Sequence, residues 1–220
     1  MTPRLALACC LVLSGALLAA PLRGHIDDTD AQLYQVLARQ MAAAHAWLEP
    51  GQAPASLRPF REHLPFGQWP SVAAIRLLGE GALPWLGLSF SLGTVALVLA
   101  LGTRLVSLRA GVLAALLLAC NETFFVYGAR ARLDPLLVLL ATASAAPVLL
   151  GRLSGRGFLF AGAAGALAAL VKGPFGLVPL GAAGGARALC NAFGPEAGSE
   201  RLQKLFRALG ALALLLVAAA

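Results

Sequence analysis

Charged residues are scarce in this chain of 220 residues, where Asp, Glu, Lys and Arg make up only 12%. A soluble domain carries about 25% charged residues, so this scarcity excludes an ordinary soluble fold. Aromatic residues are also few, at 7%, and the four cysteines show no Cys-x-x-Cys or Cys/His spacing of the kind that binds metal. The chain is instead 59% hydrophobic and contains 24 glycines, a composition typical of closely packed membrane helices.

Long apolar runs predict a polytopic membrane protein, because a spanning helix needs about 20 mostly apolar residues. The predicted spans are at about 5–22, 82–102, 110–127, 134–151, 157–183 and 207–220. The fifth run can cross twice only if it breaks at Lys172-Gly173-Pro174, where we expect a tight turn or a re-entrant break. The last run is short, so we expect a chain truncated inside a helix. The predicted fold class is all-α, with residues 1–220 in a single transmembrane domain.

Basic residues in the short loops predict the orientation. The loops with Arg104 and Arg109, with Arg152 and Arg156, and with Arg187 to Arg207 fall on one side, which the positive-inside rule assigns to the cytoplasm. Residues 23–81, the corner from Arg130 to Asp134 and the break at Lys172 then lie outside. Six basic residues contradict the rule there, namely Arg58, Arg61, Arg76, Arg130, Arg132 and Lys172. An anionic ligand would explain them, and pairing with the outer carboxylates is the alternative explanation.

The first outer loop, residues 23–81, predicts two short helices. Apolar residues recur at helical spacing from Asp30 to Leu48, and Asp30 is the expected N-cap. Trp69 to Leu78 forms the second predicted helix. Two juxtamembrane helices lying on the outer leaflet fit this pattern better than a soluble domain does.

Ionisable residues gather on the same outer side. Three acids within four residues, Asp27, Asp28 and Asp30, exceed what one helix cap requires, so Asp30 is a candidate for catalysis as well as for capping. Asp134 opens a predicted span, where a negative charge suits the helix dipole. Lys172 lies beside a helix break and is well placed to hold a phosphate.

Glu62 and His63 add a further pair of ionisable residues on this side. A metal site needs three or four ligands, so a divalent metal held in part by Glu62 is only one option. Solvated residues at the membrane interface are the alternative interpretation.

Four segments resemble motifs of the polyprenyl-phosphate-sugar-dependent membrane glycosyltransferases, which include bacterial aminoarabinose transferase and the protein O-mannosyltransferases. Asp30 to Met41 resembles the first outer-loop motif, and Arg61 to Trp69 resembles the next, where Glu-Lys-Pro-Pro is commoner. Arg130 to Asp134 resembles the arginine-to-Leu-Asp corner, and Leu170 to Pro174 matches the Lys-Gly-Pro motif. The resemblance covers about residues 25–180. It implies the N-terminal portion of a multi-helix (GT-C type) glycosyltransferase fold.

The resemblance also implies a role for each matching residue. Asp30 matches the essential first-loop aspartate, which accepts a proton from the acceptor nucleophile or orients it. Lys172, Arg130 and Arg132 would neutralise the phosphate of the departing lipid. Asp134 would position these groups or the sugar and is the second expected catalytic residue. The remaining residues expected to bind the lipid phosphate or the sugar are Tyr34, Arg61 and His63.

The implied function is sugar transfer from a polyprenyl-phosphate donor to a lipid or protein acceptor at the periplasmic face of the bacterial inner membrane. Ala31, Leu33 and His63 stand where aminoarabinose transferase has Glu, Arg and Lys, so that sugar is not implied here. Expected partners are the donor, the acceptor and membrane lipids, without nucleic acid. We expect this polypeptide alone to be inactive. A transporter or flippase for a lipid-linked sugar, and an inactive fragment of the enzyme, are the alternatives.

Overall fold

The computed structural model describes residues 3–20, 28–51, 60, 62–151 and 154–193, and these ranges contain helices and no β-strand. The predicted span 207–220 and the expected binding residue Arg61 lie outside the described residues. So do the loop residues Asp27, Arg58 and Arg152.

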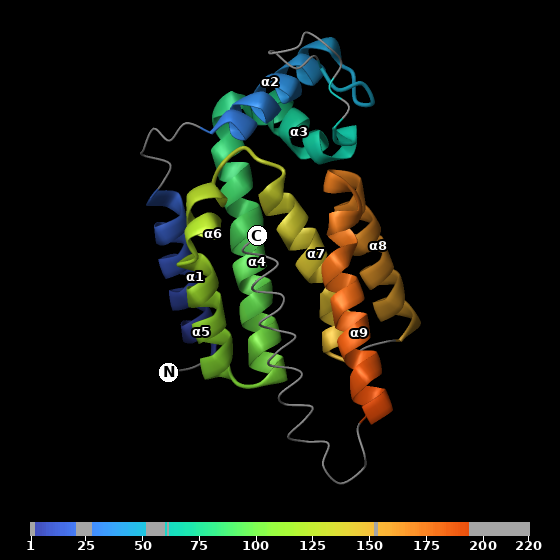
Figure 1. Ribbon diagram of the computed structural model, residues 1–220. Coiled ribbons are helices and arrows are strands. Elements are labelled where there is room, and N and C mark those ends of the chain that lie inside the picture. Colours follow the sequence, from blue (N-terminus) through green and yellow to red (C-terminus); the bar gives the residue numbers. More distant parts are fainter. Residues whose placement is uncertain (1–2, 21–27, 52–59, 61, 152–153, 194–220) are drawn as a thin grey trace.

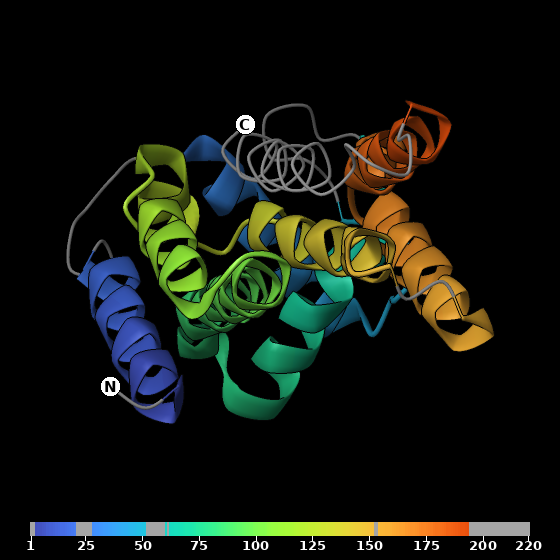
Figure 2. The ribbon, with the colours of Figure 1, turned by 90° about the horizontal axis from the view of Figure 1, so that it is seen from below.

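Most helices lie side by side and alternate in direction along the chain, except that α5 and α6 run the same way (Figure 1). They are α1 (Pro3–Ala19), α4 (Leu83–Leu105), α5 (Leu108–Ala119), α6 (Glu122–Tyr127), α7 (Asp134–Leu149), α8 (Gly155–Lys172) and α9 (Val178–Phe193). Figure 2 shows α4 and α7 in the middle, with α1 and α5 packed on α4, and with α8 and α9 packed on α7.

Within the described residues, two stretches are long and apolar enough to cross a membrane, Glu80–Leu105 and Gly155–Ala188. The second stretch contains α8, a turn and most of α9. Three shorter apolar helices accompany them at Ala8–Ala19, Leu108–Ala119 and Asp134–Leu149. Large apolar side chains such as Phe158 and Leu159 are exposed on α8, as expected for a surface that faces lipid.

Two short helices lie across one end of this bundle, which we call the upper end because Figure 1 draws it at the top. They are α2 (Thr29–Ala44) and α3 (Trp69–Leu78), and α3 has the predicted bounds. Helix α2 stops before the predicted Leu48 because His45 takes a left-handed conformation with φ of 54°. The N–H of Ala46 then donates to the carbonyl of Met41, which closes the helix end.

The predicted N-cap of α2 is wrong by two residues. Asp28, in an extended conformation, caps the helix by accepting a hydrogen bond from the N–H of Ala31 at 3.0 Å. Asp30 therefore lies in the first turn of α2, and its carboxylate is available for other partners.

The apolar run predicted at 110–127 consists of two helices instead of one. The chain leaves α5 at Cys120, and the side chain of Asn121 accepts a hydrogen bond from the N–H of Phe124 at 3.1 Å. This cap starts the short helix α6, because an asparagine side chain satisfies a backbone donor that would otherwise lack a partner. Helix α6 leads directly into the corner at residues 128–133.

A tight turn lies at the expected break after Lys172. Gly173 adopts φ of 75°, which ends α8, and the 3₁₀ turn Gly173–Leu177 follows before α9 begins. Helix α8 runs toward the upper end of the bundle and α9 runs back from it (Figure 1). The turn between them therefore lies at the upper end, near α2 and α3.

Several arginines lie at the opposite, lower end. Arg104 is in the last turn of α4, and Arg109 and Arg156 are in the first turns of α5 and α8. Arg187 of α9 donates to the carbonyl of Val148 near the end of α7 at 3.3 Å. The bundle therefore has one basic end and, at the other, the mixed cluster of acids and bases described next.

Candidate active site

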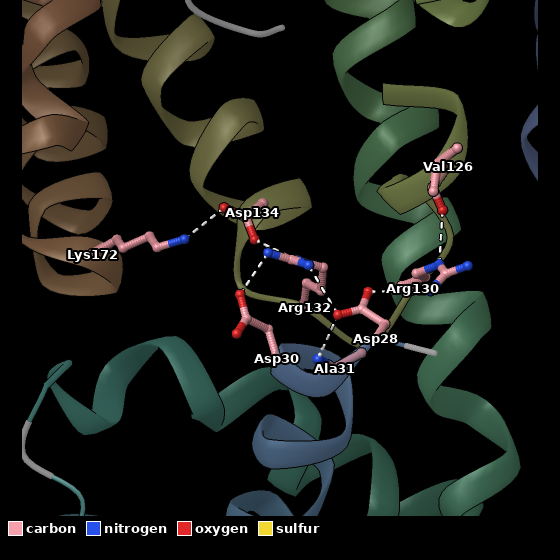
Figure 3. A network of polar contacts seen from close by, with 8 residues as sticks. All are labelled: Asp28, Asp30, Ala31, Val126, Arg130, Arg132, Asp134 and Lys172. Atoms are coloured by element: carbon pink, nitrogen blue, oxygen red, sulfur yellow. Dashed lines mark hydrogen bonds and ion pairs between the residues drawn. The ribbon is translucent and has the colours of Figure 1, made fainter. Parts of the chain in front are cut away.

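Segments far apart in the sequence meet at the upper end of the bundle (Figure 3). They are the start of α2, the corner at residues 128–133, the first turn of α7 and the last turn of α8. An apolar cluster that includes residues of these segments consists of Tyr34, Leu37, Phe60, Leu133, Leu136 and Val171. These side chains come from α2, from the segment at residue 60, from the end of the corner, and from α7 and α8. Their burial in one cluster draws together the segments that carry the polar residues.

Helix α4 holds the corner at residues 128–133 from the other side. The buried hydroxyl of Ser91 donates to the carbonyl of Gly128 at 2.6 Å. Gly87, one turn earlier, lies so close to the carbonyl of Arg130 that a Cβ there would collide with it. The corner is thus fixed by close backbone packing, which only a glycine at position 87 permits.

Arg132 is the centre of the polar cluster and binds a different carboxylate with each of its three nitrogens. Its Nη1 lies 2.9 Å from Asp28, its Nη2 lies 2.7 Å from Asp30, and its Nε lies 3.0 Å from Asp134. Its guanidinium also lies over the ring of Tyr127 at 4.5 Å. Burial alone would lower the pKa of Arg132, but the bonds and charges of Asp134 and Asp28 outweigh it and raise that pKa.

Lys172 extends the cluster onto α8. Its ammonium donates to Oδ1 of Asp134 at 2.7 Å, while Oδ2 of the same carboxylate accepts from Arg132. The side chains of Lys172 and Asp134 are 26% and 33% exposed, so a ligand can reach both. Asp134 therefore links the two cations that border the cavity described below.

Asp28 and Asp30 differ in their access to a ligand. The side chain of Asp28 is 5% exposed and accepts bonds from both Arg130 and Arg132, at 3.3 and 2.9 Å. The side chain of Asp30 is 52% exposed and contacts Arg132. A substrate can approach Asp30, whereas Asp28 is enclosed by the protein.

Arg130 is held on the α6 side of the cluster. Its Nε donates to the carbonyl of Val126 at 2.8 Å, and its guanidinium lies 5.6 Å from the ring centre of Tyr127. Together with the bond to Asp28, these contacts join α6 to the start of α2.

Tyr34, expected to bind substrate, is buried in the apolar cluster. Its ring centre lies 6.4 Å from that of Phe60 and 6.0 Å from that of His63. Burial, together with the charges of Asp30 and Asp134, raises the pKa of Tyr34 to about 12, so its hydroxyl stays protonated. Burial and the charge of Lys172 lower the pKa of His63.

Glu62, the suggested metal ligand, is exposed. Among the residues that the structure describes, it belongs to no group of three or more His, Cys, Asp or Glu side chains placed to hold a metal ion.

A cavity of about 580 Å³ opens beside the cluster. Its charged lining consists of Arg132, Asp134 and Lys172, which lie together at the upper end of the bundle. The rest is mostly apolar and comes from α4, α6, α7, the α8–α9 turn and the start of α9, with Tyr127, Leu137, Val138, Ala141, Phe175 and Val178 among the lining residues. Its size is in the range of ligand pockets, and its lining suits a molecule with an anionic head and an apolar tail.

The structure brings most of the predicted site residues together. One connected set of contacts contains Asp30, Arg132, Asp134 and Lys172, and Arg130 joins it through Asp28. The sequence did not single out Asp28 as a site residue, although it belongs to the run of three acids that pointed to this segment. The motif comparison placed the key aspartate at position 30. Nothing in the sequence showed that Asp28, two residues earlier, also contacts Arg130 and Arg132.

The family model for dolichyl-phosphate-mannose-protein mannosyltransferase matches residues 62–220. No curated protein and no solved structure matches the chain. The match confirms the family resemblance. The matched residues include the three later motifs apart from Arg61, whereas the motif at Asp30 to Met41 lies before them.

Proposed function

The chain belongs to the dolichyl-phosphate-mannose-protein mannosyltransferase family, whose members are membrane-integral glycosyltransferases. We propose that it moves a sugar from a polyprenyl-phosphate donor to an acceptor at the outer face of the membrane. The observation that carries this proposal is the cavity with cations at its charged end and an apolar lining elsewhere. A polyprenyl-phosphate sugar has the matching chemistry, with a phosphate between a sugar and a long hydrocarbon.

Lys172 and Arg132 are the groups proposed to hold the donor phosphate. Both line the cavity, and the bridging carboxylate of Asp134 keeps them at a fixed separation. Negative charge develops on the phosphate as the sugar leaves, so fixed cations stabilise the transition state more than the bound donor. The apolar surroundings strengthen these contacts because water screens them less.

Asp30 is proposed to act on the acceptor. The acceptor oxygen attacks C1 of the sugar, and the bond from C1 to the phosphate oxygen breaks with its electron pair moving to the phosphate. The proton of the acceptor hydroxyl passes to the carboxylate of Asp30, which is the most exposed acid of the cluster. Asp134 already bonds to both cations, so it serves to position them.

The two ends of the bundle support an outer location for this site. Arg104, Arg109 and Arg156 lie at the lower end, which the positive-inside rule assigns to the cytoplasm. The cluster then lies at the opposite face, which in a bacterial inner membrane is the periplasmic face. Transporters bind their substrates near the middle of the membrane, so a cluster at one end supports a transferase over a transporter.

The test is sugar transfer by the full-length protein in membranes. Polyprenyl-phosphate mannose and other polyprenyl-phosphate sugars carrying a radiolabel are supplied with lipid and protein acceptors. We expect transfer from at least one donor by the wild type and by Glu80→Gln, a control at an exposed acid that pairs with Arg39. We expect a loss of about 100-fold or more in Asp30→Asn. A wild type inactive with every donor would remove the proposal, and full activity in Asp30→Asn would remove the role of Asp30.

A further inference from the structure

Asp28 is a carboxylate enclosed by the protein immediately before α2. Its side chain is 5% exposed, against 52% for Asp30. A buried carboxylate is costly unless donors surround its oxygens. Such donors are present here, so the position of Asp28 is closely determined.

The two oxygens of Asp28 join three separate groups (Figure 3). Oδ1 accepts from the N–H of Ala31 at 3.0 Å and from Nη1 of Arg132 at 2.9 Å. Oδ2 accepts from Nη1 of Arg130 at 3.3 Å. One carboxylate therefore connects the first turn of α2 to both arginines of the corner at residues 128–133.

Arg132 transmits this constraint to the groups proposed to act on the substrates. Its Nη2 binds Asp30 and its Nε binds Asp134, which in turn binds Lys172. The guanidinium is planar and rigid, so fixing Nη1 also fixes the directions of the other two nitrogens. The bond from Asp28 thus helps to determine where the carboxylate of Asp30 lies relative to the ammonium of Lys172.

We infer that Asp28 is a positioning residue for sugar transfer, because it holds Arg132 in the orientation in which Nη2 binds Asp30 and Nε binds Asp134, the partner of Lys172. Asp28 does not touch donor or acceptor and acts through Arg132. The inference rests on the proposed function, and it adds a residue that lies outside the motif positions.

Helix capping is the simpler role for Asp28, and one substitution separates the two roles. Asparagine caps helices about as well as aspartate, so Asp28→Asn keeps an acceptor for the N–H of Ala31. The same substitution removes the negative charge that binds Arg130 and Arg132. If Asp28 only caps α2, Asp28→Asn has wild-type kinetics.

The experiment measures kcat and the KM for donor in the full-length protein, together with Tm. We expect Asp28→Asn to lower kcat on the order of 100-fold, the effect of displacing reacting groups by about 1 Å. The KM for donor should rise by a smaller factor, because Lys172, which Asp28 does not contact, still binds the phosphate. The exposed acid Glu80 supplies the matched control, and Glu80→Gln keeps the wild-type kcat. A kcat within about twofold of wild type in Asp28→Asn overturns the inference.

A double substitution tests whether Asp28 acts through the placement of Asp30. Asp30→Glu keeps the carboxylate but moves it by one methylene, so the carboxylate at position 30 is already displaced in this background. Adding Asp28→Asn then has a smaller further effect on its placement. We expect Asp28→Asn to lower kcat less in this background than in the wild type, whereas independent roles predict effects that multiply within about twofold. Multiplied effects overturn the inference.

If Asp28→Asn does not fold, the comparison uses Asp28→Glu, which keeps the negative charge but displaces it. A wild-type kcat in Asp28→Glu overturns the inference. If the wild type transfers no sugar, the proposed function fails, and the inference fails with it. If both the wild type and Asp28→Asn transfer sugar at the same rate, the inference about Asp28 fails and the proposed function stands.

Discussion

The ammonium of Lys172, at the end of α8, lies 2.7 Å from Oδ1 of Asp134, at the start of α7. This contact joins two of the motifs that the sequence showed separately. It places a cation that can bind phosphate at the border of the cavity, next to the carboxylate that also binds Arg132.

Lys172→Gln is expected to lower kcat for sugar transfer by about 10²–10³-fold, because one donor to the charge that develops on phosphate is lost. Lys172→Arg is expected to recover part of the rate, since it keeps the charge but not the compact geometry of the ammonium. Initial rates with saturating donor measure the effect. Arg104→Gln, at the opposite end of the bundle, is the control and should keep wild-type rates; equal rates in Lys172→Gln would contradict the prediction.

Asp134→Asn is expected to lower the free energy of unfolding by about 2 kcal/mol, because two charge-assisted hydrogen bonds lose their charged acceptor. The substitution also leaves Arg132 and Lys172 facing each other without the intervening negative charge. Thermal unfolding of the purified protein in detergent measures the loss. An unchanged Tm would show that the bridge from Arg132 to Lys172 contributes nothing to stability.

Gly87→Ala is expected to lower the free energy of unfolding by about 1–3 kcal/mol, because the new Cβ collides with the carbonyl of Arg130. Gly162→Ala is the matched control, since a Cβ at that helical position in α8 meets nothing within 4 Å. There alanine is expected to leave Tm unchanged or to raise it. Equal Tm values for the two variants would show that the corner at residues 128–133 can move away from α4.

His63 predicts a pH dependence of stability. Burial and Lys172 hold the pKa of His63 below its usual value, so the unfolded state binds more protons as the pH falls below about 6.5. The free energy of unfolding should therefore fall with pH in that range and level off below the folded-state pKa. His63→Gln lacks this contribution. Tm measured from pH 8 to 5 checks the prediction, and parallel curves for the two proteins would refute it.

Val178→Trp is expected to raise the KM for long-chain donors, because Val178 lines the apolar part of the cavity. A donor with a short isoprenoid should be affected less, since less of its tail enters that part. The control is Leu113→Trp, at an exposed position of α5 that is not part of the cavity lining. The KM of each variant for donors of two chain lengths gives the comparison, and equal effects at both lengths would place the donor tail elsewhere.

Much of the helical arrangement could be predicted from the sequence because apolar runs, glycine and proline act locally. The bounds of α3 and the turn after Lys172 are examples. The break between α5 and α6 was missed, because a run of apolar residues hides the side-chain cap that Asn121 provides. Capping depends on backbone geometry, which composition does not reveal.

The candidate site could be predicted in outline, since the count of membrane crossings put Asp30, Asp134 and Lys172 on one face and the structure places them at one end of the bundle. The place of Asp28 could not be predicted, because its role depends on two arginines about a hundred residues later in the chain. Tyr34 shows the opposite case. It belongs to a motif, yet the fold buries it in the apolar cluster, where packing accounts for its position.

The carboxylates of Asp28, Asp30 and Asp134 and the cations of Arg130, Arg132 and Lys172 balance in formal charge. If the cavity holds a lipid phosphate as proposed, that phosphate competes with the resident acids for the donors of Arg132 and Lys172. Its binding then weakens contacts within the cluster, and those contacts re-form when the lipid phosphate leaves. Such competition favours moderate affinity and rapid release over tight binding.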